Sequence, residues 1–152
     1  ESLDQVTEEL YDKTMAVNLK GPFRLGALAG AHMAGHGGGS IINVGTIASV
    51  TASPRELPYA CAKAGLNALT VGLAEAFAPT VRVNAILPGP FATDVTDAWP
   101  EEAKAGAFVP LQRIGQPEEI TGAALYLAGA ASSFTTGATI RIDGGLTRHI
   151  TG

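Results

Sequence analysis

The stretch YACAKAGLNALTVGLAEAFAPTVRVNAIL, residues 59–87, contains a helix followed by a strand. Its first part has apolar residues at helical spacing and predicts a helix to about Ala78. Its last part, 81–87, is apolar and rich in β-branched residues, and a second short apolar run, Ile41-Ile42-Asn43-Val44, precedes the helix. A strand, a helix and a strand joined by short connections predict parallel strands with a right-handed crossover. The sequence therefore predicts an α/β fold.

Ligands of such sheets bind beyond the carboxyl ends of the strands. Thr46 follows the first predicted strand, and residues 88–93 follow the second. These residues are therefore candidates for a binding site. The next stretch, 94–109 with Trp99, has weak periodicity, and we expect it to form a mobile cover over that site.

Tyr59 and Lys63 stand four positions apart on the predicted helix, so they share one face. A cation about 4 Å from a phenol, at an effective dielectric near 20, favours phenolate by roughly 4 kcal/mol. That corresponds to a fall in the phenol pKa on the order of three units, before desolvation reverses part of it. The pair thus predicts an acid/base group that works near neutral pH. The alternative is a core ring and a solvated amine that are neighbours by chance.

The first part of the chain predicts a helix from Thr7 to about Met33 that Pro22 interrupts. Proline has no N–H, so the carbonyl of Asn18 loses its helical partner and the axis bends. Buried carbonyls are rarely left unpaired, which makes Asn18 a candidate for contact with water or a ligand. The alternative is a simple kink whose carbonyl faces solvent.

Glycine is frequent in residues 35–40, but this stretch follows a helix and precedes a strand, the reverse of a dinucleotide loop. We interpret it as a connection. Pro117 followed by two acids predicts a helix to about Ala128. Residues 139–142 predict a last strand, and Asp143-Gly144-Gly145 its turn.

Composition narrows the class of protein. The 152 residues are 46% hydrophobic and 16% charged, with a net charge of −4, which predicts one globular domain with a large core. No basic run is present that would recruit nucleic acid or an anionic membrane. The single cysteine, Cys61, excludes an internal disulfide framework and a multi-cysteine zinc site, and we predict no metal site. The sequence shows no secretion signal and no membrane span, so we expect a cytoplasmic protein.

Taken together at this spacing, several pieces of the sequence resemble the C-terminal part of the short-chain dehydrogenase/reductase family. The resemblance covers nearly the whole chain. The pieces are Val17-Asn18-Leu19-Lys20-Gly21, Ile41-Ile42-Asn43-Val44, the Tyr59 and Lys63 pair, Arg82-Val83-Asn84, Pro88-Gly89 with Thr93, and Asp143-Gly144-Gly145.

The resemblance implies a Rossmann-like doubly wound parallel sheet, of which residues 1–152 form the C-terminal part with about three strands. It implies that Tyr59 is the general acid/base and that Lys63 lowers the pKa of this tyrosine and holds the nicotinamide ribose. Asn18 would anchor a water relay through its main-chain carbonyl. The cofactor would be NAD or NADP, and its implied contacts are Tyr59, Lys63, Pro88, Gly89, Phe91 and Thr93.

Two departures from the family pattern stand out. Thr46 occupies the position of the family's catalytic serine, thirteen residues before the tyrosine (59 − 46), so the hydroxyl is kept on a β-branched carbon. The family's first half, with its glycine-rich dinucleotide loop, lies outside this sequence. The resemblance thus implies an NAD(P)-dependent oxidoreductase that interconverts a carbonyl and a secondary alcohol, with a small-molecule substrate and a homodimeric or homotetrameric assembly. The alternative is an inactive fragment that acts as an assembly or interaction module.

Overall fold

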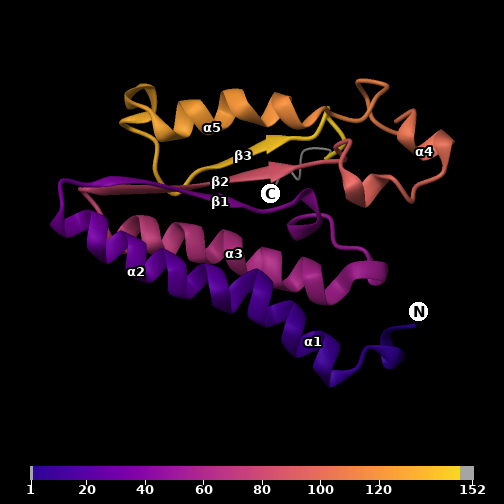
Figure 1. Ribbon diagram of the computed structural model, residues 1–152, viewed down its shortest axis with the longest axis horizontal. Coiled ribbons are helices and arrows are strands. Elements are labelled where there is room, and N and C mark those ends of the chain that lie inside the picture. Colours follow the sequence, from indigo (N-terminus) through magenta and orange to yellow (C-terminus); the bar gives the residue numbers. More distant parts are fainter. Residues whose placement is uncertain (1, 148–152) are drawn as a thin grey trace.

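Three parallel strands form the centre of the structure, a computed structural model that describes residues 2–147 (Figure 1). Strand β1 is Gly39–Val44, β2 is Val81–Pro88 and β3 is Thr139–Ile142. Their order is β1-β2-β3, with Ile41 opposite Val83 and Ile86 opposite Ile140. The predicted parallel pairing is confirmed, and β3 has the bounds that the sequence predicted.

Helices cover both faces of this sheet. The described residues form the helices α1 (Glu8–Met15), α2 (Gly21–Gly35), α3 (Leu57–Ala76), α4 (Glu101–Lys104) and α5 (Thr121–Ala128). Helices α2 and α3 lie side by side on one face, and α5 lies on the other (Figure 1). This layering is that of a Rossmann-like α/β fold, as predicted.

The predicted first helix is divided in two. A π-helical turn, Ala16–Lys20, separates α1 from α2, and the amide of Gly21 donates to the carbonyl of Ala16. Pro22 lies in the first turn of α2, where a missing N–H costs little. The wide turn thus accommodates the proline where we had expected only a bend. Leu19 of this turn packs on α3, where a Cβ at Gly65 would lie 2.9 Å from Leu19 Cδ2.

Helix α3 and strand β2 supply most of the core. Ala62, Leu66 and Leu73 of α3 are buried, as the predicted apolar stripe requires, and β2 is buried along nearly its whole length. Asn84 on β2 is fully buried, and its side chain donates to the carbonyl of Thr135 and accepts from the amide of Ala138. This side chain therefore fixes the segment that leads into β3.

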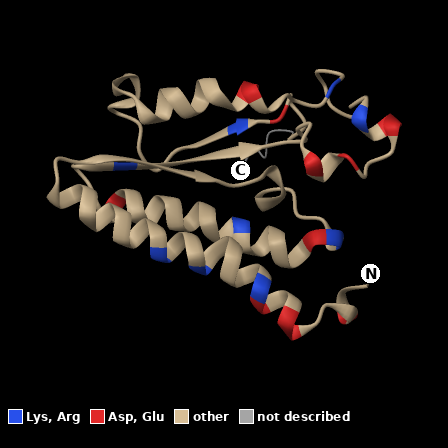
Figure 2. Ribbon diagram, in the orientation of Figure 1, with Lys and Arg blue, Asp and Glu red and all other residues tan. Residues whose placement is uncertain are grey.

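Charged residues are sparse along α2 and α3, and basic and acidic residues are scattered over the other elements (Figure 2). Within residues 2–147, no helix combines the length and the apolar character needed to cross a membrane. Several large apolar side chains on the two helices are exposed, namely Phe23, Leu25, Leu28 and Val71.

Candidate active site

A cavity of about 300 Å³ lies at the carboxyl ends of β1 and β2. Its lining comes from the loop after β1, the first turn of α3 and the segment after β2. The lining residues are Gly45, Thr46, Tyr59, Pro88, Gly89, Pro90, Phe91, Thr93, Val95, Thr96 and Trp99. Six of the residues singled out from the sequence therefore meet at one site: Thr46, Tyr59, Pro88, Gly89, Phe91 and Thr93.

Tyr59 enters this cavity from the start of α3. A 3₁₀ turn at Pro54–Glu56 precedes the helix, and Pro58 occupies its first turn, where no helical N–H is needed. The helix therefore begins two residues before Tyr59, and its ring is half-buried.

Thr46 reaches the same cavity from β1. Its backbone is extended, with φ −162° and ψ 154°, and its hydroxyl accepts a 3.3 Å hydrogen bond from the amide of Ala48. The hydroxyl also makes a polar contact with the phenol of Tyr59. The two hydroxyls, thirteen residues apart in the sequence, are thus neighbours in space.

Lys63 lies beside Tyr59 but does not reach its phenol oxygen by a hydrogen bond. Its Nζ donates to the carbonyl of Val44 over 2.9 Å and lies 5.7 Å from the centroid of the Tyr59 ring. The amine thus ties α3 to the end of β1. The same-face prediction is confirmed, although the amine is directed to the backbone.

The ionisation of the pair differs from the sequence-based expectation. Burial raises the pKa of Tyr59 above its ordinary value, the carboxylate of Glu56 raises it further, and the contact with Thr46 opposes this. Burial lowers the pKa of Lys63. The shift of the phenol pKa is therefore opposite in sign to the one that the pairing predicts, because desolvation of the phenol is its largest cause. At neutral pH the phenol keeps its proton and can donate it.

Asn18 lies in the π-helical turn and is not among the residues that line the cavity. Its side-chain amide donates to the carbonyl of Thr14 over 3.0 Å. π-helical turns disturb the regular hydrogen bonding of a helix and are frequent at functional sites. The assigned relay through the Asn18 carbonyl stays a prediction.

The segment after β2 is fixed against the end of β3. The amide of Gly89 donates to the carbonyl of Ile142 over 2.9 Å. A Cβ at Gly89 would lie 2.8 Å from the Cα of Asp143, so the close approach requires glycine. The Pro88-Gly89 and Asp143-Gly144-Gly145 pieces, far apart in the sequence, thus meet at one edge of the sheet.

The sequence predicts that residues 94–109 cover the site, and three of them, Val95, Thr96 and Trp99, do line the cavity. The Thr96 hydroxyl accepts from the amide of Thr93 over 3.0 Å and donates to its carbonyl over 2.7 Å. The spacing of Thr93 and Thr96 is that of a helix cap, a signal that was available in the sequence. Mobility of this segment stays a prediction.

Comparison with known proteins identifies the family. Residues 1–147 match the profile of the family described as Enoyl-(Acyl carrier protein) reductase. The chain is 39% identical over 147 residues to the 3-oxoacyl-(acyl-carrier-protein) reductase FabG of Thermotoga maritima, an alignment that covers 95% of this chain and 60% of that protein. It is also 39% identical to an NAD-dependent glycerol dehydrogenase of Listeria innocua, over 97% of this chain and 59% of the relative. The chain therefore belongs to the short-chain dehydrogenase/reductase family.

Solved structures agree with this assignment. A putative gluconate dehydrogenase from Agrobacterium tumefaciens superposes with a TM-score of 0.92 at 31% identity, covering 99% of this chain and 61% of that one. A gluconate 5-dehydrogenase from Burkholderia cenocepacia, in complex with NADP and tartrate, gives 0.90 at 35% identity with the same coverage. The chain thus spans about three fifths of the length of these relatives.

Proposed function

We propose that a protein carrying this chain is an NAD(P)-dependent oxidoreductase that interconverts a carbonyl and a secondary alcohol. The observation that carries this proposal is the cavity at the strand ends, where Thr46, Tyr59 and Thr93 place hydroxyls beside the rings of Phe91 and Trp99. Pockets for small ligands combine such apolar walls with a few polar groups that orient the ligand.

The lining suits a nicotinamide ring. Pro88 and Phe91 offer flat apolar surfaces, and Thr93 together with nearby backbone groups offers partners for a carboxamide. NAD-dependence is stated for the glycerol dehydrogenase relative, and NADP is bound in one structural neighbour. In this chain the cofactor would supply or accept the hydride, and NAD and NADP remain equal candidates.

The residues of the chain divide the remaining work. The phenol of Tyr59, kept protonated by burial, donates a proton to the carbonyl oxygen during reduction and accepts one during oxidation. The hydroxyl of Thr46, in contact with that phenol, holds the substrate oxygen near the proton. Lys63 and Asn18 are proposed to hold the ribose and a proton relay respectively, as the family resemblance implies.

Lys63 also has a structural task that favours this reaction. Its bond to the carbonyl of Val44 connects the first two turns of α3 to the end of β1, two elements that carry Tyr59 and Thr46. The relative position of the two hydroxyls is therefore restrained by this side-chain hydrogen bond as well as by the loop between them. A site held in this way keeps its geometry before substrate binds.

A second candidate is an inactive module that serves assembly. The observation in its favour is the exposed apolar face of α2 and α3, where Leu25 is 72% and Leu28 is 61% exposed. Patches of this kind mark contact with another protein. A homodimer or homotetramer of an active enzyme would cover the same face, so the patch supports association under both proposals.

Titration of the full-length protein with NADH and NADPH separates the two. Trp99, the single tryptophan of these 152 residues, lines the cavity, so the part of the fluorescence change that Trp99→Phe removes reports on binding there. An active enzyme responds to at least one nucleotide and oxidises it when a carbonyl substrate is added. A protein that responds to neither nucleotide contradicts the proposed activity.

A further inference from the structure

Residues 89–116 form a long segment between β2 and α5. Backbone hydrogen bonds join the start of this segment to its end. The amide of Ala92 donates to the carbonyl of Gly115, and the amide of Gly115 donates to the carbonyl of Pro90, each over 2.9 Å. These bonds form an isolated parallel bridge between Phe91 and Gly115. The end of this segment is thereby held against its start, beside the candidate active site.

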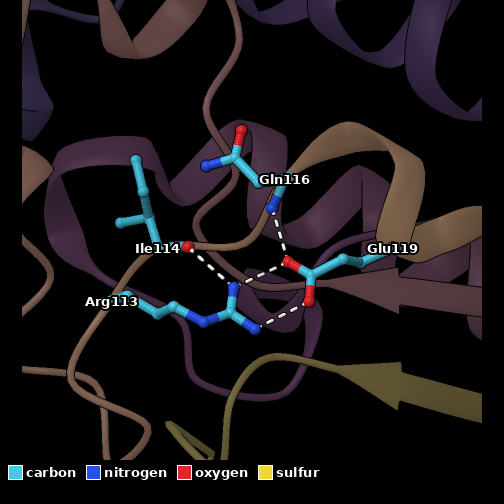
Figure 3. Close-up of polar contacts among 4 residues, drawn as sticks. All are labelled: Arg113, Ile114, Gln116 and Glu119. Carbon is cyan, nitrogen blue, oxygen red and sulfur yellow. Dashed lines mark hydrogen bonds and ion pairs between the residues drawn. The ribbon is translucent and has the colours of Figure 1, made fainter.

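The carboxylate of Glu119 forms hydrogen bonds to residues on both sides of Gly115 (Figure 3). Its two carboxylate oxygens each accept a 2.7 Å hydrogen bond from the guanidinium of Arg113, which precedes Gly115 by two residues. Oε2 also accepts a 2.7 Å bond from the amide of Gln116, the residue after Gly115. One carboxylate therefore fixes the backbone before and after the glycine.

Arg113 adds a further restraint. Its Nη1 donates to the carbonyl of Ile114 over 3.3 Å, so the guanidinium bonds the peptide next to Gly115 as well as the carboxylate (Figure 3). The partners hold the pKa of Glu119 at about 2, well below its ordinary value, chiefly through the hydrogen bonds from Arg113. The carboxylate therefore stays charged throughout the neutral range.

Both side chains are well exposed, 52% for Arg113 and 40% for Glu119. Exposed ion pairs contribute little to global stability. The bidentate geometry and the added backbone bonds instead confer local order. The pair is thus placed to act on the position of one loop and not on the stability of the domain.

We propose that Arg113 and Glu119 form a clamp that positions Phe91 to Thr93 for the nicotinamide, an inference that rests on the proposed function. The clamp acts through Gly115, because the backbone hydrogen bonds of Gly115 fix the positions of Pro90 and Ala92. Gly115 also packs closely on Phe91, since a Cβ at Gly115 would lie 2.5 Å from the Phe91 ring. Phe91 and Thr93 line the cavity that contains Tyr59. Arg113 and Glu119 are therefore positioning residues, not catalytic ones.

Hydrogen exchange and nucleotide affinity in the full-length protein test this clamp. Glu119→Gln removes the charge, Arg113→Lys keeps the charge but loses the planar fork, and the double variant tests whether the two act as one unit. The matched control is Glu101→Gln, which breaks the exposed ion pair to Lys104 on α4 in the same segment. The reporters are the amides of Ala92 and Gly115.

The clamp predicts exchange at least about tenfold faster at Ala92 and Gly115 in Glu119→Gln, with the amide of Gly89 unchanged. We expect the dissociation constant for the bound nucleotide to rise about tenfold to a hundredfold, since small displacements at a site have effects of this size. Arg113→Lys should give a smaller change, the double variant no more than Glu119→Gln, and Glu101→Gln none. The urea midpoint should stay near that of the parent in every case.

Three results contradict different parts of the inference. Unchanged exchange at Ala92 and Gly115 in Glu119→Gln, or an equal effect of Glu101→Gln, overturns the clamp even if the parent is an active enzyme. A parent that binds neither NADH nor NADPH overturns the proposed function and, with it, the nicotinamide as the object of the clamp. A uniform loss of protection with a lower urea midpoint in both single variants also contradicts it, since the pair would then support the whole fold.

Discussion

Gly115→Ala adds a methyl group where the structure has no room for one. An ideal Cβ at this position would lie 2.5, 2.8 and 2.9 Å from three atoms of the Phe91 ring. Carbon atoms pack best at about 3.5–4.0 Å, so ring and backbone have to separate by about 1 Å. Gly115 is held by hydrogen bonds to Pro90 and Ala92, so we expect most of the movement in the ring, which lines the cavity.

The size of the effect follows from the cost of overpacking. Extra methyl groups at fitted sites cost about 1–3 kcal/mol. If that cost appears in nucleotide binding, the dissociation constant rises between about fivefold and about 150-fold, since each 1.4 kcal/mol is about tenfold. Any part that appears in folding lowers the free energy of unfolding by the same scale.

Trp99 fluorescence during titration with NADH or NADPH, together with urea unfolding, measures both parts in the full-length protein. Gly122→Ala is the matched control, because this glycine lies in α5 with no atom within 4 Å of an added Cβ. The control should leave affinity unchanged and stabilise the helix by up to about 1 kcal/mol. Parent-like affinity and stability in Gly115→Ala would refute the packing argument.

Three further predictions concern the site and the sheet. Thr46→Ser should remain active and Thr46→Val should lose most of its turnover, because serine keeps the hydroxyl that is in contact with Tyr59 and valine does not; a fully active valine variant would exclude a role for the hydroxyl. The hydrogen bonds from Arg113 hold the pKa of Glu119 at about 2, so the clamp should be intact at neutral pH and weaken as pH falls toward 2; the ratio of the Ala92 exchange rate in Glu119→Gln to that in the parent should therefore be larger at pH 7 than at pH 2, and an equal ratio would contradict this. The 152 residues alone should not form a stable monomer, because β1 ends the three-strand sheet with an open edge; size-exclusion chromatography with hydrogen exchange should show association or rapid exchange at 41–44, and a compact monomer protected there would oppose the prediction.

Periodicity and short connections were enough to predict the framework. Helix α3 and strand β3 were found because apolar spacing and β-branched runs are local signals, and parallel pairing followed from the connection lengths. The π-helical turn at 16–20 could not be read in this way. Proline shows where a helix is disturbed. The π-helical turn, however, lies among tertiary contacts, such as the packing of Leu19 on Gly65, that local sequence does not reveal.

The candidate site was also predicted only in part. Thr46, Tyr59 and Phe91 converge because parallel strands end at one edge, which is a rule of topology. The direction of the Tyr59 pKa shift was not predictable, since it depends on the burial of the phenol and on the nearby carboxylate of Glu56. The bonds that Glu119 makes on both sides of Gly115 were also missed, because a bidentate pair between a loop and the 3₁₀ turn Pro117–Ile120 has no spacing rule.

Replacement of Tyr59 by phenylalanine in the full-length protein tests the central claim most directly. The change removes one hydroxyl and keeps the ring, so nucleotide affinity measured through Trp99 should stay close to that of the parent. Loss of the proton donor should slow single-turnover hydride transfer by about 10²–10⁴-fold. A variant that binds nucleotide and keeps more than a few per cent of the parent rate would contradict the assignment of Tyr59 as the acid/base.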